Sequence, residues 1–230
     1  MPDEGKPTEL KVLKQCWFAG SHSNVGGSYP DTGIANLTLA WLMQQLSPML
    51  TFDPNYIPWQ GELNIAFLNN QAPFVDRPWS CGKVYSSGSA FVDFLTGTST
   101  RTPGTYCRTN AATGAPTTVR LRKTHEFIHP SVRVRRALGG LGTDDSQYYN
   151  NPWPLAGWTL VPPKGAFAAN TSLKQYDKKD LWEKEYDDSW KWVKQDADGR
   201  VTWIAEDELQ GAEWDLVVKG SKAFQEIEAR

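Results

Sequence analysis

Three segments near the N-terminus follow one another in an order that restricts the fold more than any other feature of the sequence. Residues 11–18 are apolar enough for a strand buried on both faces, and residues 19–29 form a loop with His22 and two adjacent glycines. Residues 31–47 then carry an apolar face at helical spacing, which ends before Pro48. This order predicts a strand, a functional loop and a packed helix, as in one unit of an α/β sheet.

The loop carries a specific pattern. Residues 17–29 read Trp-Phe-Ala-Gly-Ser-His-Ser-Asn-Val-Gly-Gly-Ser-Tyr. This segment resembles the catalytic-histidine segment of an α/β-hydrolase family that includes type VI secretion phospholipase effectors and uncharacterised fungal proteins. Asn24 stands where that family commonly has Asp, and Ser28 where it commonly has Gly. Residues 124–135 look like the C-terminal region of the fungal members. The resemblance implies the C-terminal part of a serine ester or lipid hydrolase.

By this resemblance His22 is the general base, which takes the proton of a serine nucleophile and returns it to the leaving group. The neighbouring residues would support the oxyanion or the pocket; they are Ser23, Asn24, Gly26 and Gly27. The serine of an α/β-hydrolase lies on a Gly-x-Ser-x-Gly turn upstream of the histidine. No such pattern occurs in this sequence, and 21 residues precede His22. We therefore expect the nucleophile and the acid to be absent from this chain.

Two functions remain open. The first is a fragment or divergent member of an ester or lipid hydrolase family, completed by a companion chain or by self-association. The second is a non-hydrolytic protein that keeps the pocket and binds a hydrophobic small molecule, or performs isomerase-like or cyclase-like acid/base chemistry with His22. Whether the chain is an enzyme stays open, and no cofactor is expected.

An internal serine cluster is a weaker candidate for the nucleophile. Ser86, Ser87 and Ser89 lie between a possible strand at 83–85 and a possible helix at 90–95. The glycine spacing differs from a nucleophile turn, and the serines follow the histidine in the chain. A plain turn and helix cap is therefore the preferred interpretation.

A zinc-binding pattern also occurs, because residues 125–129 read His-Glu-Phe-Ile-His. Zinc binding would require both imidazoles on one side of a helix. Pro130 disfavours helical geometry at His129, so we expect an extended segment and no metal site. The nearby arginines 133, 135 and 136 could hold phosphate, but ion pairs with the acidic segments 177–188 and 206–213 are favoured.

The fold class predicted is α/β, with a partial α/β-hydrolase-like sheet. Residues 1–50 would supply its last strand, histidine loop and helix, and residues 51–230 an irregular, Trp-rich α+β C-terminal region. In that region we expect irregular structure at 51–80, loops or linkers at 98–116 and 139–151, and a helix start near Glu206. Further elements are a helix from Pro130 to Leu138, a strand at 157–161 and hairpin strands at 190–194 and 201–205. Most of the eleven tryptophans are expected in the core.

The composition limits the kinds of binding partner and the cellular compartment that we expect for this chain. A net charge of −2 gives no electrostatic reason to expect nucleic acid or an anionic membrane. The three cysteines, Cys16, Cys81 and Cys107, are odd in number and suit a reducing compartment. The sequence shows neither a signal peptide nor an apolar run long enough to span a bilayer, so a cytoplasmic location is expected.

Overall fold

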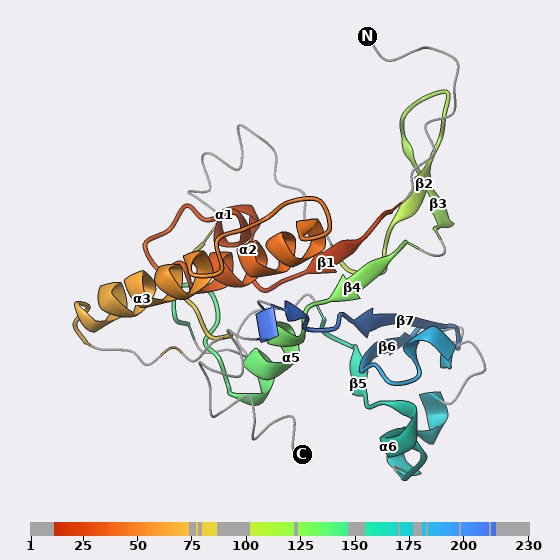
Figure 1. Ribbon diagram of the computed structural model, residues 1–230. Helices are drawn as coiled ribbons and strands as arrows, with labels where there is room; N and C mark the ends of the chain where they lie inside the picture. The colour runs from red at the N-terminus through yellow and green to blue at the C-terminus, as the bar shows by residue number, and fades with distance from the viewer. Residues whose placement is uncertain are drawn as a thin grey trace.

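The computed structural model describes residues 12–73, 77, 80–86, 102–121, 124–146, 155–169, 171–176, 181–182, 184–197, 199–211 and 213–214. A five-stranded sheet lies at the centre (Figure 1), in the order β1-β4-β7-β6-β5. Its strands are β1 (Gln15–Trp17), β4 (Glu126–Ile128), β7 (Val201–Glu206), β6 (Lys191–Gln195) and β5 (Thr159–Val161). The strands β1, β4 and β7 are parallel, and β6 runs against the other four. The chain is therefore a mixed α/β protein.

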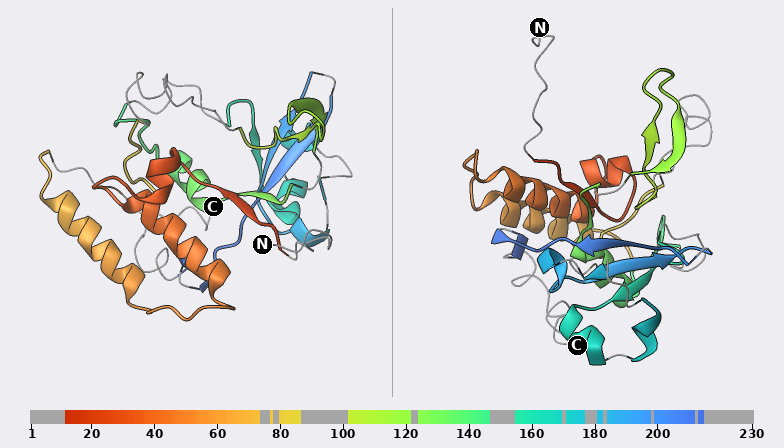
Figure 2. Two further views of the ribbon diagram at one scale, coloured as in Figure 1. Left: turned by 90° about the horizontal axis from the view of Figure 1, so that it is seen from above. Right: turned by 90° about the vertical axis from the view of Figure 1, so that its right-hand side faces the viewer.

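Helices lie on both sides of this sheet (Figure 2), with α2 and α3 on one side and α6 on the other. A hairpin of two further strands projects away from the sheet. The helices are α1 (His22–Gly26), α2 (Gly33–Leu46), α3 (Tyr56–Asn69), α5 (Pro130–Ala137) and α6 (Lys164–Ala169), with short 3-10 helices η1 (Thr171–Tyr176) and η3 (Lys184–Tyr186). The hairpin strands are β2 (Cys107–Thr109) and β3 (Pro116–Arg120).

Strand β6 shows why the sheet holds together. Successive side chains of a strand point to opposite faces. Trp192 packs with Ile128, Trp158 and Ile204 on one face, whereas Val193 packs with a second cluster on the other. That second cluster contains Val161, Phe167 and Leu181. Both faces of the sheet are thus buried, and Trp158 and Trp192 are core residues as expected.

The structure confirms several of the helices and strands that the sequence predicted. The apolar segment at 11–18 contains β1, and the helix expected at 31–47 is α2. Proline at the first helical position opens α5, because its missing N–H is not needed there. The strand expected at 157–161 contains β5, and the predicted hairpin is the pair β6 and β7.

The prediction of irregular structure at 51–80 is wrong, because α3 occupies residues 56–69. Pro58 lies in the first turn of α3, where proline does not interrupt helical hydrogen bonds. Ile57 packs against Ala40 and Met43 of α2, so tertiary contact stabilises a helix that the prolines obscured.

Three other boundaries differ from expectation. The predicted loop at 98–116 contains β2, which pairs with β3. The predicted linker at 139–151 is held at Thr143, which forms a bridge with Val84. Glu206 ends β7, and helical residues start at Gly211, five residues after the expected position. Residues 87–89 and the helix expected at 90–95 lie outside the described residues.

Within the described part of the chain, no helix combines the length and the apolar character needed to cross a bilayer. The sheet joins β1 to four strands from beyond residue 50. The division into 1–50 and 51–230 stays a prediction about domain organisation.

Candidate functional site

His22 lies just beyond the carboxyl end of β1 and is the first residue of α1. The chain turns into α1 through Gly20, whose φ of +97° lies in the left-handed region. A Cβ atom at Gly20 would lie 2.6 Å from the Cβ of Asn24, so glycine is required there by both conformation and space. The His22 side chain is exposed, and no hydrogen bond or ion pair reaches its ring within the described residues.

Asn24 fixes the position of α1. Its side chain is buried, and its Nδ2 donates to the Ser21 Oγ at 2.8 Å and to the Tyr85 carbonyl at 2.9 Å. Its Oδ1 accepts from the Tyr85 N–H at 2.7 Å. The amide therefore pairs with the backbone of Tyr85 in the 80–86 segment, as a neighbouring strand would. Asn24 acts as an anchor for the helix that carries His22.

The other predicted support residues lie at the end of α1. Gly27 adopts a φ of +80°, and its N–H donates to the Ser23 carbonyl at 3.2 Å. The Ser28 N–H donates to the same carbonyl at 3.2 Å. Gly26 is exposed, and a Cβ atom added to it would have no neighbour within 4 Å. The fold thus brings Ser23, Gly26 and Gly27 close to His22 within one short helix.

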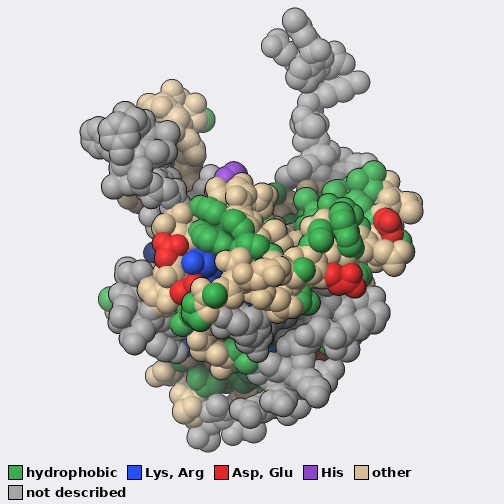
Figure 3. Space-filling view, turned by 90° about the vertical axis from the view of Figure 1, so that its left-hand side faces the viewer, with side chains coloured by type: hydrophobic (Ala, Val, Ile, Leu, Met, Phe, Trp, Pro, Cys, Tyr) green, Lys and Arg blue, Asp and Glu red, His purple; other side chains and the backbone are tan. Residues whose placement is uncertain are grey.

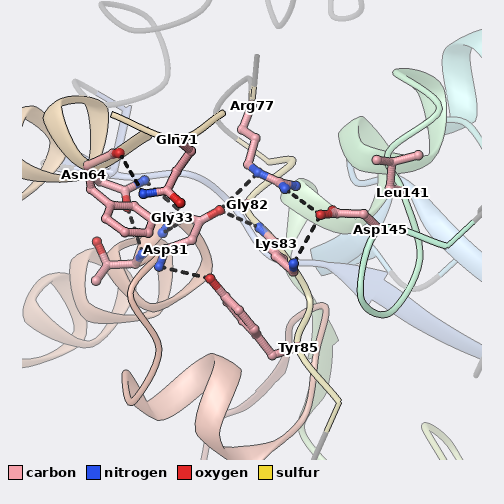
Figure 4. Close-up of polar contacts among 12 residues, drawn as sticks. Asp31, Gly33, Asn64, Gln71, Arg77, Gly82, Lys83, Tyr85, Leu141 and Asp145 are labelled. Atoms are coloured by element: carbon pink, nitrogen blue, oxygen red, sulfur yellow. Dashed lines mark hydrogen bonds and ion pairs between the residues drawn. The ribbon is translucent and has the colours of Figure 1, made fainter. Parts of the chain in front are cut away.

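A network of charged side chains surrounds the start of α2 (Figure 4). Asp31 is buried, and its two oxygens accept from the Gly33 N–H at 2.9 Å and the Lys83 N–H at 2.8 Å. The guanidinium of Arg77 reaches Asp31 at 3.3 Å. These residues were not expected from the sequence, because they are far apart in the chain.

Asp145 completes the network from the opposite side (Figure 4). Its Oδ2 lies 2.8 Å from Arg77 Nη2 and 3.3 Å from Lys83 Nζ. The hydrogen bond from Arg77 lowers the pKa of Asp145 below its ordinary value, and the nearby charge of Lys83 lowers it further. Asp144 and Asp145 both have positive φ, at 50° and 61°, so the network holds a turn that few residue types favour.

A second group of polar side chains lies at the carboxyl ends of β4 and β7, where the sequence predicted no site. His129 is 1% exposed and stacks on Phe18 at 4.5 Å. Its Nδ1 lies 2.8 Å from Ser131 Oγ, and its Nε2 lies 2.9 Å from Glu213 Oε1. The Ser131 N–H also donates to Nδ1, so Nδ1 is the acceptor and Nε2 carries the proton toward Glu213.

This Ser131, His129 and Glu213 chain has the connectivity of a hydrolase triad, but all three residues are buried. A substrate carbonyl would have to enter the core to reach Ser131. The side chain of His129 also caps the N-terminus of α5 through the Ser131 N–H. We therefore assign this group to structure, where it joins β4, α5 and the segment that contains Glu213.

The zinc-binding pattern does not form a helix, as expected from Pro130. Residues 126–128 form β4, His125 is exposed with a φ of 52°, and His129 is buried. No group of three or more His, Cys, Asp or Glu side chains that could hold a metal occurs among the described residues.

Two of the three arginines of α5, Arg133 and Arg135, are buried, whereas Arg136 is exposed and lies over the ring of Trp192. Arg133 forms an ion pair with Glu206 at 2.9 Å, as predicted for the acidic segment at 206–213. Arg135 instead donates to the carbonyls of Ser80, Gly82 and Leu141.

The Cys16 thiol lies within electrostatic reach of Asp207 and Glu213. Burial raises the pKa of the Cys16 thiol, and the carboxylates of Asp207 and Glu213 raise it further. Cys16 is therefore protonated at neutral pH and unsuited to act as a nucleophile.

Comparison with known proteins gives one family. Residues 2–45 match the model of a family described as the Tle1-like phospholipase effector of type VI secretion, catalytic domain. The match covers β1, α1 and nearly all of α2. No curated protein and no solved structure matches the chain. Over this segment the chain is therefore similar to the catalytic domain of a phospholipase-type hydrolase family.

Proposed function

We propose that this chain belongs to an ester or lipid hydrolase in which His22 is the general base. The observation that carries the proposal is the match over residues 2–45, which includes the segment that contains His22. Three features of the structure support it: His22 follows a parallel strand, its ring is exposed, and Asn24 anchors the helix on which it lies. Binding sites of α/β proteins commonly lie beyond the carboxyl ends of their strands.

In this mechanism His22 removes the proton of a serine hydroxyl as that oxygen attacks the ester carbonyl. The protonated imidazole then returns the proton to the leaving alcohol, and a water molecule repeats both steps to release the acid. The serine and the orienting acid come from a companion chain or from an additional segment of the protein. Ser23, Gly26 and Gly27 line the approach to His22, and Asn24 keeps α1 in place.

A second candidate is a non-hydrolytic protein that keeps the same pocket. Asn24 favours it, because both polar ends of this side chain are used by Ser21 and Tyr85. In addition, the amide of Asn24 is not a carboxylate, so it cannot orient the imidazole as the acid of a triad would. His22 would then act on a hydrophobic ligand as a single acid or base, or would only contact it.

The test compares two exposed histidines. Ester hydrolysis would be measured with short-chain nitrophenyl esters and with phospholipid, for the wild type, His22→Asn and His125→Asn, each purified together with its companion chain or as part of the longer protein. Asparagine is chosen because His125 has a positive φ, which asparagine tolerates. We expect His22→Asn to lose about 100-fold or more of the activity, since a general base contributes roughly that factor. His125→Asn should keep it.

Fluorophosphonate labelling followed by mass spectrometry separates the two candidates. A labelled serine within the chain would locate the nucleophile, and labelling of a co-purified partner would identify the companion. No labelling, together with ligand binding that requires His22, would support the non-hydrolytic candidate. Equal hydrolysis by the wild type and His22→Asn would refute the role of His22.

A further inference from the structure

The β2–β3 hairpin is held in a fixed direction by a buried carboxylate at its base. Glu126 is 8% exposed, and its Oε1 accepts from Trp17 Nε1 at 3.0 Å and from the Gly104 N–H at 3.1 Å. A Cβ atom added to Gly104 would lie 3.0 Å from the ring of Trp158, so the segment that leads into β2 packs directly on the core. Tyr106 then stacks on Trp17, with 6.3 Å between the ring centroids. The hairpin therefore projects from the sheet as an oriented arm (Figure 1).

The charges of the hairpin and its flanking residues are all of one sign. Residues 94–125 contain five Lys and Arg and no Asp or Glu, although the whole chain has a net charge of −2. The Lys and Arg side chains among the described residues of this range are Arg108 on β2 and Arg120 on β3. Arg108 is exposed, and the Arg120 side chain is 36% exposed and lies 3.5 Å from Asp196, outside the hairpin. The net charge of the chain therefore conceals a local positive charge that would attract a polyanion.

The tip of the hairpin is uncharged and presents hydrogen-bond donors. Residues 110–115 read Asn-Ala-Ala-Thr-Gly-Ala. The Asn110 Oδ1 accepts from the N–H groups of Ala112 at 2.9 Å and Thr113 at 3.3 Å, and these bonds shape the turn. The Asn110 Nδ2 and the Thr113 hydroxyl keep hydrogens that no other described residue accepts. Figure 3 shows the tip rising above the rest of the described surface, with no charged side chain on the face in view.

The chemistry of the hairpin distinguishes the possible polyanions. An anionic membrane is bound by cations together with large apolar side chains that enter the lipid. The exposed apolar residues Val119 and Leu121 lie at the end of the hairpin near the sheet, and the tip has only alanine. A protein partner needs large buried anchors, which the tip also lacks. The major groove of duplex DNA, in contrast, admits a two-stranded β-ribbon.

We propose that the β2–β3 hairpin binds duplex DNA, with its tip in the major groove. The small residues of the tip enter the groove, where Asn110 and Thr113 donate to acceptors on the base edges. Arg108 and Arg120, nearer the sheet, contact phosphates at the sides of the groove. Arg120 exchanges its long contact with Asp196 for a phosphate. The proposal concerns residues distinct from His22, so it holds or fails independently of the hydrolase chemistry.

The experiment is fluorescence anisotropy of the full chain with a labelled DNA duplex of about 20 base pairs. The wild type should bind in about 50 mM NaCl, and its affinity should fall steeply as the salt is raised to about 200 mM. The double variant Arg108→Gln and Arg120→Gln should bind roughly tenfold or more weakly, with the slope of log affinity against log salt reduced by about two, one for each lost phosphate contact. The matched control, Lys164→Gln and Lys174→Gln, removes the same charge from exposed side chains of α6 and η1, far from the hairpin (Figure 1), and should bind like the wild type.

A single variant keeps the test independent of the contact between Arg120 and Asp196. The Arg108 side chain is exposed and has no partner among the described residues, so Arg108→Gln should leave the fold intact. It should weaken binding about threefold and lower the salt slope by about one. Circular dichroism and thermal unfolding would verify that all variants are folded.

Four results would overturn the proposal. The first is a wild-type chain that binds no duplex at about 100 µM protein in about 50 mM NaCl, since non-specific DNA binding is normally stronger than this. The second is equal binding by the wild type and the arginine variants. The third is equal affinity for single-stranded and duplex DNA, which would exclude the groove. The fourth is tighter binding to phosphatidylglycerol vesicles or to polyglutamate than to DNA, which would assign the hairpin to a lipid surface or to an acidic protein.

Discussion

Asn24 donates a hydrogen bond to a backbone carbonyl, which a carboxylate could not do. Its Nδ2 donates to Ser21 Oγ and to the Tyr85 carbonyl, and it is 4% exposed. An aspartate could still accept from the Tyr85 N–H, but its charge would face the carbonyl oxygen at close range. At the scale of one residue, the surroundings of position 24 therefore favour an amide over a carboxylate.

We predict that Asn24→Asp lowers the free energy of unfolding by about 1–3 kcal/mol at neutral pH, the cost of leaving a buried polar group without its partner. Urea denaturation would measure the loss. Asn55→Asp is the control, because it adds the same charge at an exposed helix start, where a negative charge is tolerated. If the two variants were equally stable, the anchoring role of Asn24 would be wrong.

The charged network around Asp31 joins several elements that are distant in the sequence. Arg77 bridges Asp31, at the start of α2, to Asp145, in the turn after α5. The same turn is fixed by the Asp144 N–H, which donates to the Val84 carbonyl at 2.7 Å. Since the 80–86 segment also holds α1 through Asn24, the network determines where α1 lies relative to α2.

A pH-dependent test follows from the lowered pKa of Asp145. A carboxyl whose pKa is lower in the folded state stabilises the fold above its ordinary pKa, which is about 3.9, and loses this contribution as the pH falls further. Asp145→Asn should therefore cost about 1–3 kcal/mol at pH ~7, and the difference from the wild type should shrink below pH ~4.

Denaturation at a series of pH values would measure this difference. Asp196→Asn is the control, because Asp196 forms a longer pair, at 3.5 Å, with Arg120, whose side chain is 36% exposed against 8% for Arg77. It should change stability by less than about 1 kcal/mol. A difference for Asp145→Asn that is constant from neutral to acidic pH would contradict the ion pair.

Sequence patterns predicted the elements whose signals are local. The spacing in α2, the proline that opens α5 and the turn between β6 and β7 each act over a few residues. Helix α3 escaped prediction because Pro58 and the prolines on either side of the helix suggested a loop. Its stabilising contact with α2 comes from residues distant in the sequence, which a local pattern does not show.

The candidate site was predictable only in part. The segment around His22 carries its own pattern, so its position after a strand and before α2 could be expected. The charged network could not be predicted from the sequence. It joins Asp31, Arg77 and Asp145, which are far apart in the chain and come together only when it folds. The same holds for His129 and Glu213, which are separated by 84 residues.

For the whole molecule, the sheet connects the N-terminal and C-terminal parts. Strand β1 pairs with β4, and β4 pairs with β7. Asp207, which follows β7, also receives the indole N–H of Trp41 from α2 at 2.8 Å and forms an ion pair with Lys14 at 2.8 Å. These contacts tie α2 to the carboxyl end of β7, the central strand of the sheet.

We therefore expect α2 and the hairpin of β6 and β7 to unfold together. Hydrogen exchange with mass spectrometry at increasing urea would follow peptides from residues 33–46 and 191–206, which should show one shared midpoint. Peptides from the exposed β2–β3 hairpin serve as a comparison for local opening. Two separate midpoints would instead support independent domains divided near residue 50.

The pairing of β1 with β4 has a consequence for synthesis. The side chain of Gln15 in β1 donates a hydrogen bond to the carbonyl of Thr124, close to β4, and these two residues are 109 positions apart in the sequence. At roughly 5–20 residues per second, β1 leaves the ribosome on the order of 5–20 s before its partner strand is made. During this interval the nascent chain carries an apolar strand with open backbone groups, a natural target for chaperones that bind extended segments.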